Sequence, residues 1–186
     1  MNNPKTSVFF SGYRSPQLWD GYPPLNNTTY KSSKQHFHEK HVALMLQIIN
    51  IYIRSGIKTF IVGGTQGFDL MCAELILSLR KYNDISLIIA KPFPDHGVQW
   101  TTNLKEHFEN ICEKADSTIN VSLGIYSPKK MALRNQWMID NADYGLIMWD
   151  EKHTGEIFSC MKYSKKCNKT IIVINPDTLQ LSTLVV

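Results

Sequence analysis

Short apolar segments rich in β-branched and aromatic residues alternate with longer amphipathic segments along this chain. Short apolar runs bounded by glycine, proline or polar residues are typical of buried strands, and apolar residues three to four positions apart are typical of helices. The pattern predicts six strands, at Ser7–Ser11, Thr59–Val62, Ser86–Ala90, Ser117–Val121, Tyr144–Trp149 and Thr170–Ile174. It predicts helices between them, at Lys34–Arg54, Phe68–Tyr82, Val98–Lys114, Lys129–Asn141 and 155–166.

This alternation predicts an α/β protein of three layers, with a mostly parallel sheet of about six strands covered by helices on both faces. We expect one domain over residues 1–186, with a core at about 7–176. The polar, proline-rich stretch 12–33 is long for a loop inside a compact domain, which favours a binding loop or a lid.

The segment after the second strand contains three closely spaced glycines, Gly63, Gly64 and Gly67, and a helix follows at once. Glycines permit a tight turn and a close approach of the backbone to a ligand. The first amides of a helix and the positive end of its dipole favour an anion. The alternative is a tight turn without a ligand. Thr65 lies within the same loop and offers a hydroxyl.

Charge and composition disfavour a dedicated DNA-binding protein and a membrane protein. The formal net charge of +4 over 186 residues is modest for a protein dedicated to DNA binding. No apolar stretch approaches the ~20 residues that span a bilayer, so we expect a cytoplasmic protein. The four cysteines, Cys72, Cys112, Cys160 and Cys167, include no Cys-x-x-Cys pair and are expected to be reduced thiols.

We expect no cofactor. His36, His38 and His41 gather at the start of the first helix, but no carboxylate pattern accompanies them, so we expect no metal site either.

Five segments at the predicted strand ends form a recognisable series. They are Ser11-Gly12-Tyr13-Arg14; Gly63-Gly64-Thr65-Gln66-Gly67-Phe68-Asp69 with Ala73-Glu74; Pro92-Phe93 with Gln99-Trp100; Tyr126 with Arg134-Asn135, Met138 and Asp140; and Trp149-Asp150 with Thr154-Gly155. In this order the segments resemble the DUF1273/YpsA-like branch of the SLOG superfamily, which is related to the DprA and LOG proteins. The resemblance runs from about Val8 to Pro176.

The resemblance implies a Rossmann-like domain that binds nucleotides or molecules derived from them, and that assembles as a homo-oligomer. The residues that it places in a ligand site are Gly12, Tyr13, Arg14, Gly63, Gly64, Thr65, Gly67, Phe68, Asp69, Pro92, Phe93, Trp100, Arg134, Asn135, Asp150, Thr154 and Gly155. The chain departs from the family in the last loop, which commonly carries Gly-Gly-Thr and here reads Lys152-His153-Thr154-Gly155.

Several candidates have two interpretations. Asp69 either binds ribose hydroxyls or simply stabilises a helix N-terminus. Glu74 is either an acid for N-glycosidic cleavage or a structural partner of Arg14 or Arg134. The two arginines are either anion clamps or solvated surface groups. Asn135 offers both a donor and an acceptor to a base or a ribose edge.

Aromatic residues are expected beside the ligand. Trp100, after the Pro92-Phe93 loop, predicts a wall against a base, and Tyr13 and Trp19 are further candidates. Trp137 and Trp149 are expected in the core. The apolar positions of helix residues 42–53 form either a core face or an oligomer interface.

Three functions follow from these observations. The first is binding of a nucleotide-derived anion, such as ADP-ribose, by a sensor or a sequestering protein. The second is a nucleotide N-glycosidase, either a phosphoribohydrolase or a deoxyribosyltransferase-like enzyme, that uses Glu74 or Asp69. The Pro-Gly-Gly-x-Gly-Thr-x-x-Glu motif of the phosphoribohydrolases is absent from this sequence. The third, nucleic-acid binding as in DprA, is disfavoured by the modest charge.

Overall fold

The computed structural model describes residues 6–12 and 33–184, with residues 33–38 described by their backbone only. The strands are β1 (Ser7–Ser11), β2 (Thr59–Val62), β3 (Ser86–Lys91), β4 (Ser117–Asn120), β5 (Tyr144–Met148), β6 (Thr170–Ile174) and β7 (Leu181–Leu184). The helices are α2 (Ser33–Arg54), α3 (Phe68–Arg80), α4 (Thr102–Lys114), α5 (Pro128–Asp140) and α6 (Gly155–Lys166). These elements confirm the predicted α/β class and its alternation.

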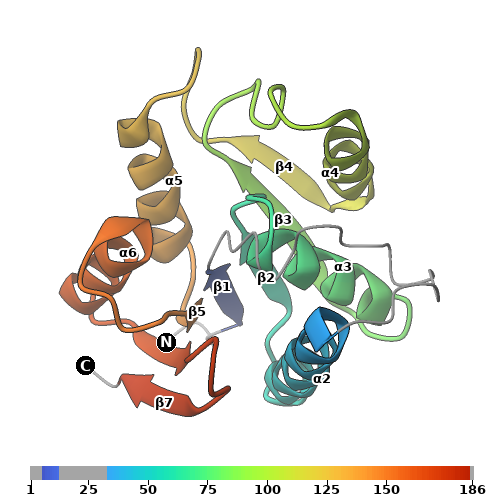
Figure 1. Ribbon diagram of the computed structural model, residues 1–186, viewed down its shortest axis with the longest axis vertical. Coiled ribbons are helices and arrows are strands. Elements are labelled where there is room, and N and C mark those ends of the chain that lie inside the picture. Colours follow the sequence, from blue (N-terminus) through green and yellow to red (C-terminus); the bar gives the residue numbers. More distant parts are fainter. Residues whose placement is uncertain (1–5, 13–32, 185–186) are drawn as a thin grey trace, which may run out of the picture.

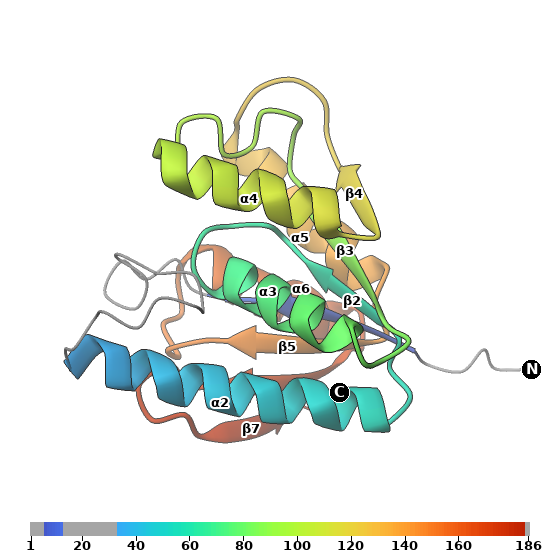
Figure 2. The same cartoon turned by 90° about the vertical axis from the view of Figure 1, so that its right-hand side faces the viewer.

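The strands form one sheet in the order β4-β3-β2-β1-β5-β6-β7. All neighbours run parallel except β6 and β7, which are antiparallel. Helices α2, α3 and α4 cover one face of the sheet, and α5 and α6 cover the other (Figure 1; Figure 2). The result is the expected three-layer arrangement.

Each inner strand contributes to two cores because its side chains alternate between the faces of the sheet. In β1, Val8 and Phe10 join the core beneath α2 and α3, whereas Phe9 joins the core beneath α5 and α6. All three side chains are fully buried. This double burial explains why the strands are apolar throughout instead of alternating with polar residues.

The chain changes direction at the centre of the sheet. From β1 it builds outward through β2, β3 and β4, and then returns across the sheet to place β5 on the other side of β1. A switch point of this kind leaves a crevice beyond the carboxyl ends of the two central strands, where ligands of such sheets bind. The loops that begin at Ser11 and Met148 flank this position.

The structure adds one strand to the expected six and shortens one expected helix by four residues. The sheet has a seventh strand, because the chain turns back after Asn175-Pro176-Asp177 and pairs Leu181 with Ile174. Helix α4 begins at Thr102 instead of Val98, because Gly97 adopts a φ of +91° and the backbone turns there before the helix starts.

The apolar face of α2 is a core face. Met45, Ile48, Ile49 and Tyr52 are buried against the sheet and α3. His41 of the same helix is fully buried, and its Nε2 lies 2.8 Å from the carbonyl oxygen of Pro176. This bond holds the segment after β6 against α2. The expected homo-oligomer remains a prediction.

The amino-terminal ends of β1 and β5 are joined by Asp143. Its Oδ2 accepts hydrogen bonds from the amides of Thr6 (2.9 Å) and Ser7 (3.0 Å) and from the Ser7 hydroxyl (2.7 Å). Burial alone would raise the pKa of Asp143, but these bonds outweigh it and hold the pKa below its ordinary value. The ionised carboxylate therefore stabilises the sheet at neutral pH.

We predict that Asp143→Asn lowers the free energy of unfolding at neutral pH, and that its cost shrinks in acid. Because the folded pKa of Asp143 lies below the unfolded value of about 3.9, the stabilisation is present above that value and is lost as pH falls through the folded pKa. Urea unfolding of both proteins between about pH 3 and 7 measures the difference, with exposed Asp95→Asn as the control. A cost that stays constant in acid would contradict this account.

Gly145 of β5 lies opposite Phe9 of β1 and leaves room for its ring. A Cβ at position 145 would stand 2.5 Å from Cε1 of Phe9. We predict that Gly145→Ala lowers the free energy of unfolding by about 1–3 kcal/mol through overpacking. In urea unfolding, the double variant with Phe9→Leu should cost less than the sum of the two single changes. Simple additivity would show that the clash is not the cause.

Candidate functional site

The glycine loop, residues 63–67, connects β2 to α3 at the carboxyl edge of the sheet. Gly64 and Gly67 have φ angles of +66° and +93°, which favour glycine. A Cβ at Gly63 would stand 1.9 Å from Nη1 of Arg134, and one at Gly64 would stand 2.7 Å from Cε2 of Phe108. The first two glycines are therefore required by close contacts within the protein.

Arg134 of α5 reaches across the strand edge and holds the glycine loop. Its Nη1 donates hydrogen bonds to the carbonyl oxygen of Gly63 (2.5 Å) and to Oγ1 of Thr65 (3.1 Å). Oδ2 of Asp69 accepts the Thr65 amide at 3.1 Å and lies 3.7 Å from the same guanidinium nitrogen. Arg134, Thr65 and Asp69 are all buried. The predicted clamp and the predicted ribose acceptor thus form a buried charge pair that supports the loop.

The end of β1 completes the floor beneath the glycine loop. A Cβ at Gly12 would stand 2.4 Å from Cδ1 of Phe68, so these two predicted ligand residues pack on each other. Ser11 is buried and interacts with the thiol of Cys160 on α6. Burial raises the pKa of Cys160 to about 12, so this thiol stays protonated at neutral pH.

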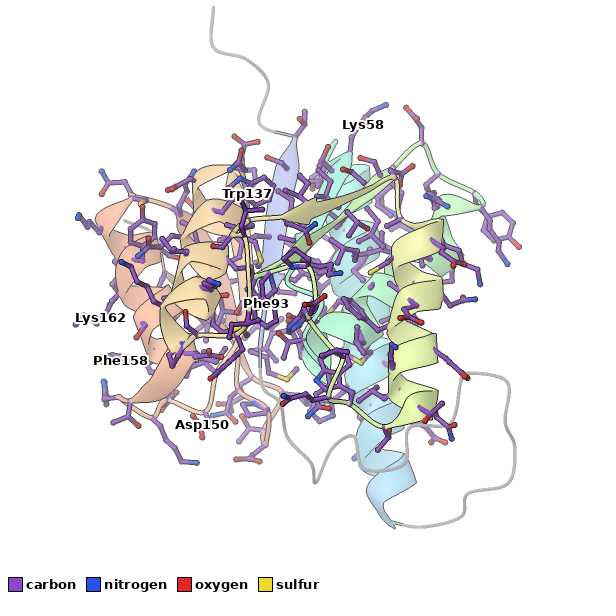
Figure 3. All side chains as sticks on the ribbon, turned by 90° about the horizontal axis from the view of Figure 1, so that it is seen from above. Lys58, Phe93, Trp137, Asp150, Phe158 and Lys162 are labelled. Carbon is purple, nitrogen blue, oxygen red and sulfur yellow. The ribbon has the colours of Figure 1, made fainter. Side chains whose placement is uncertain are left out.

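A histidine that the sequence did not single out supports the loop from its other side. Nε2 of His96 lies 3.2 Å from the carbonyl oxygen of Gly64. The His96 ring packs edge-on against Phe93, Trp100 and Phe108 at centroid distances of 5.5, 5.1 and 5.7 Å. His96 lies in a loop without periodic pattern, so no sequence signal marked it. Figure 3 shows Phe93 between the α5–α6 layer and α4.

The loop between β5 and α6 is held by contacts within itself. Nε1 of Trp149 donates to the carbonyl oxygen of Lys152 at 2.9 Å, and the Lys152 ammonium lies 2.6 Å from Oδ2 of Asp150. The first helical residue, Gly155, has a φ of +85°, and a Cβ there would meet nothing within 4 Å. The N-cap residue Thr154 makes no side-chain capping bond.

Glu74 points away from the glycine loop toward α4. Its Oε1 lies 3.4 Å from Nε2 of His107, and the side chain is 15% exposed. Within the described residues Glu74 therefore contacts His107. Arg14, one of the two arginines predicted as its structural partner, lies outside the described residues, so that pairing stays a prediction. Glu74 and Asp69 are therefore held by separate neighbours, His107 of α4 and the Arg134–Thr65 pair.

The structure brings most predicted site residues to one edge of the sheet. Those in the loops after β1, β2, β3 and β5, at the starts of α3 and α6, or on α5 are Gly12, Gly63, Gly64, Thr65, Gly67, Phe68, Asp69, Pro92, Phe93, Arg134, Asn135, Asp150, Thr154 and Gly155. Trp100 is packed against Phe108 at a centroid distance of 5.3 Å. Tyr13, Arg14 and Trp19 lie outside the described residues. Trp137 and Trp149 are partly buried against the α5–α6 core.

Asn135 is a buried residue of α5. It is only 6% exposed, and its Oδ1 accepts no hydrogen bond within the described part of the chain. It directly follows Arg134, which holds the glycine loop.

Among the residues whose side chains the structure describes, 6–12 and 39–184, no group of three or more His, Cys, Asp or Glu could hold a metal ion. No helix in that part of the chain is long and apolar enough to cross a membrane.

Comparison with known proteins assigns the family. The model of the YpsA family, described as the YspA SLOG family, matches residues 9–179. The chain belongs to this SLOG family. A UPF0398 protein from Macrococcus caseolyticus is 27% identical over 136 residues, covering 72% of this chain and 73% of that protein. A UPF0398 protein from Bacillus cereus is 26% identical over 148 residues, covering 78% and 80%.

One solved structure has a similar fold to this SLOG protein. It is the structure of DNA processing protein A from Helicobacter pylori, which was solved to show how that protein binds single-stranded DNA. The TM-score is 0.54 at 20% sequence identity, and the alignment covers 91% of this chain and 65% of that one. At this identity the likeness concerns the fold alone.

We predict that Arg134→Met lowers the free energy of unfolding by about 3 kcal/mol, because it removes the cation beside a buried carboxylate. Asp69→Asn in the same chain should recover part of this loss, which a double-mutant cycle in urea measures. The control is Arg80→Met. Because the Arg80–Asp116 pair is partly exposed, this substitution should lower the free energy of unfolding by less than about 1 kcal/mol. Equal costs at the two arginines would contradict the supporting role of Arg134.

Proposed function

We propose that this SLOG protein binds a nucleotide-derived anionic small molecule, such as ADP-ribose, at the carboxyl edge of its sheet and holds it without reaction. The observation that carries the proposal is the buried amide of Asn135, whose Oδ1 accepts no hydrogen bond within the described residues. A buried acceptor left without a partner costs about 1–3 kcal/mol. A ribose hydroxyl or a base amine would supply the missing donor.

Two helix N-termini support binding of the anionic part. Helix α3 begins after Gly67, which has no side chain to cap it, and α6 begins after Thr154, whose side chain makes no bond to the helix. The first amides of a helix lack partners within the helix, and the helix dipole adds positive potential there. Phosphate oxygens are the natural acceptors for such amides.

In this proposal Arg134 and Asp69 act mainly by shaping the glycine loop. Their polar atoms bind Gly63 and Thr65, so the loop is positioned before a ligand arrives. Arg14, which follows Gly12 in the sequence, is the cation that we expect to neutralise the ligand directly. Asn135 is then the residue that hydrogen-bonds a ribose hydroxyl or the edge of a base.

Binding without turnover has more support than catalysis. Glu74, the first candidate acid, is held by His107 between α3 and α4. Asp69, the second, supports the Thr65 amide. Nucleic-acid binding rests on the fold likeness to DNA processing protein A, and the net charge of +4 gives it little electrostatic support. The experiment below separates both alternatives from ligand binding.

We predict that wild-type protein binds ADP-ribose, and that Asn135→Leu weakens this binding about tenfold or more. The change removes the amide but keeps a similar volume, so the thermal unfolding temperature should not fall. Calorimetry gives the dissociation constants, in a panel with NAD, cyclic ADP-ribose isomers and AMP. The matched control is Asn110→Leu, at an exposed position of α4.

Chromatography of the ligand after incubation decides between binding and catalysis. Recovery of intact ligand supports a sensor or a sequestering protein. Release of free base would replace the proposal with an N-glycosidase, and Glu74→Gln would be the next variant. Failure of every nucleotide to bind, together with salt-dependent binding of a single-stranded oligonucleotide, would favour the nucleic-acid alternative.

A further inference from the structure

Among the described Phe, Tyr and Trp residues at the carboxyl edge of the sheet, Tyr126 is the most exposed. Tyr126 is 61% exposed and lies in the loop after β4, at the carboxyl edge of the sheet. Its one ring contact among the described residues is with Phe93, at a centroid distance of 6.1 Å and an interplanar angle of 79°. An edge-on contact of this kind leaves a face of the tyrosine ring uncovered.

The other aromatic rings near the site are engaged in packing. Trp100, the predicted wall, packs against His96 at 5.1 Å and against Phe108 at 5.3 Å. Phe93 is buried and contacts His96 as well as Tyr126. These rings build the α4 side of the site, and of the three described aromatic residues Tyr126 is the most exposed.

The backbone around Tyr126 is held in place. The ammonium of Lys130 donates to the carbonyl oxygen of Ile125 at 2.5 Å. The next residue after Tyr126, Ser127, is the N-cap of α5, and its hydroxyl accepts the Lys130 amide at 3.3 Å. Pro128 then fixes the first helical position. A ring presented on such a segment loses little conformational entropy when a ligand binds.

A short series of contacts connects Tyr126 with the glycine loop. The carbonyl oxygen of Gly64 contacts His96, the His96 ring contacts Phe93, and the Phe93 ring contacts Tyr126. The amide of Ser122 also donates to the carbonyl oxygen of Pro92 at 3.2 Å, which joins the loop after β4 to the loop after β3. Tyr126 thus belongs to the same rigid edge as the glycine loop, two ring contacts away from it.

We propose that Tyr126 is the specificity-determining residue of the site: it stacks on the nucleobase of the ligand while the glycine loop binds its phosphate. This inference rests on the proposed function and adds the chemical class that the site selects. Stacking between a base and an aromatic side chain contributes about 1–3 kcal/mol. The site therefore prefers phosphates that carry a base to sugar phosphates that lack one.

The test compares ADP-ribose with ribose 5-phosphate, which has no base. Tyr126→Ala should weaken ADP-ribose binding about 5- to 150-fold and leave ribose 5-phosphate binding unchanged. Tyr126→Phe keeps the ring and should retain wild-type affinity for both. Leu123→Ala, at an exposed apolar position of the same loop, is the matched control and should also bind as wild type does. Calorimetry supplies the dissociation constants and sedimentation the oligomeric state.

Each other outcome overturns the inference in a distinct way. Equal losses for both ligands would assign Tyr126 to the phosphate or sugar, and a loss in Tyr126→Phe would assign the effect to its hydroxyl. A change of oligomeric state in Tyr126→Ala with unchanged affinities would make Tyr126 an interface residue. If the wild type binds neither ligand, the proposed function itself fails. If it binds ADP-ribose and only Asn135→Leu weakens binding, the proposed function survives without the stacking residue.

Discussion

The guanidinium of Arg134 spans the carboxyl edge of the sheet, from α5 in one helical layer to the glycine loop that leads into α3 in the other. This contact constrains everything around it. Gly63 must lack a side chain because the guanidinium occupies that space, and Asp69 provides the negative charge that a buried cation requires. The contact therefore explains why position 63 is a glycine, and it joins the glycine loop to the opposite helical layer.

The glycine loop is held on its opposite side by aromatic packing. Gly64 lies against Phe108, and its carbonyl oxygen contacts His96. With Arg134 on one side and this aromatic group on the other, the loop keeps one conformation without needing a ligand to order it. A preformed loop avoids the entropic cost of ordering at the moment of binding. This is the physical link between the packing of α4 and α5 and the proposed affinity for anions.

The alternation of apolar and amphipathic segments was sufficient to predict the class, the parallel sheet and the edge where the loops gather. It could not reveal why Gly63 is a glycine, because the atom that requires it belongs to Arg134, 71 residues away. His96 carried no signal for a similar reason, since its contacts include Gly64 of the glycine loop and Phe108 of α4, which lie in other segments. Strand β7 was missed because four mostly exposed residues after a turn have too little pattern to recognise.

The contacts of His153 give a physical account of the unusual sequence of the last loop. His153, which stands where a glycine is common, packs edge-on against Trp149 and Phe158 at centroid distances of 5.8 and 5.2 Å. Its ring is thus part of the aromatic surface of α6, and the space around Gly155 stays open. The histidine therefore alters the wall beside the helix while the amides at the N-terminus of α6 remain accessible to an anion, so any change in ligand preference would arise at that wall.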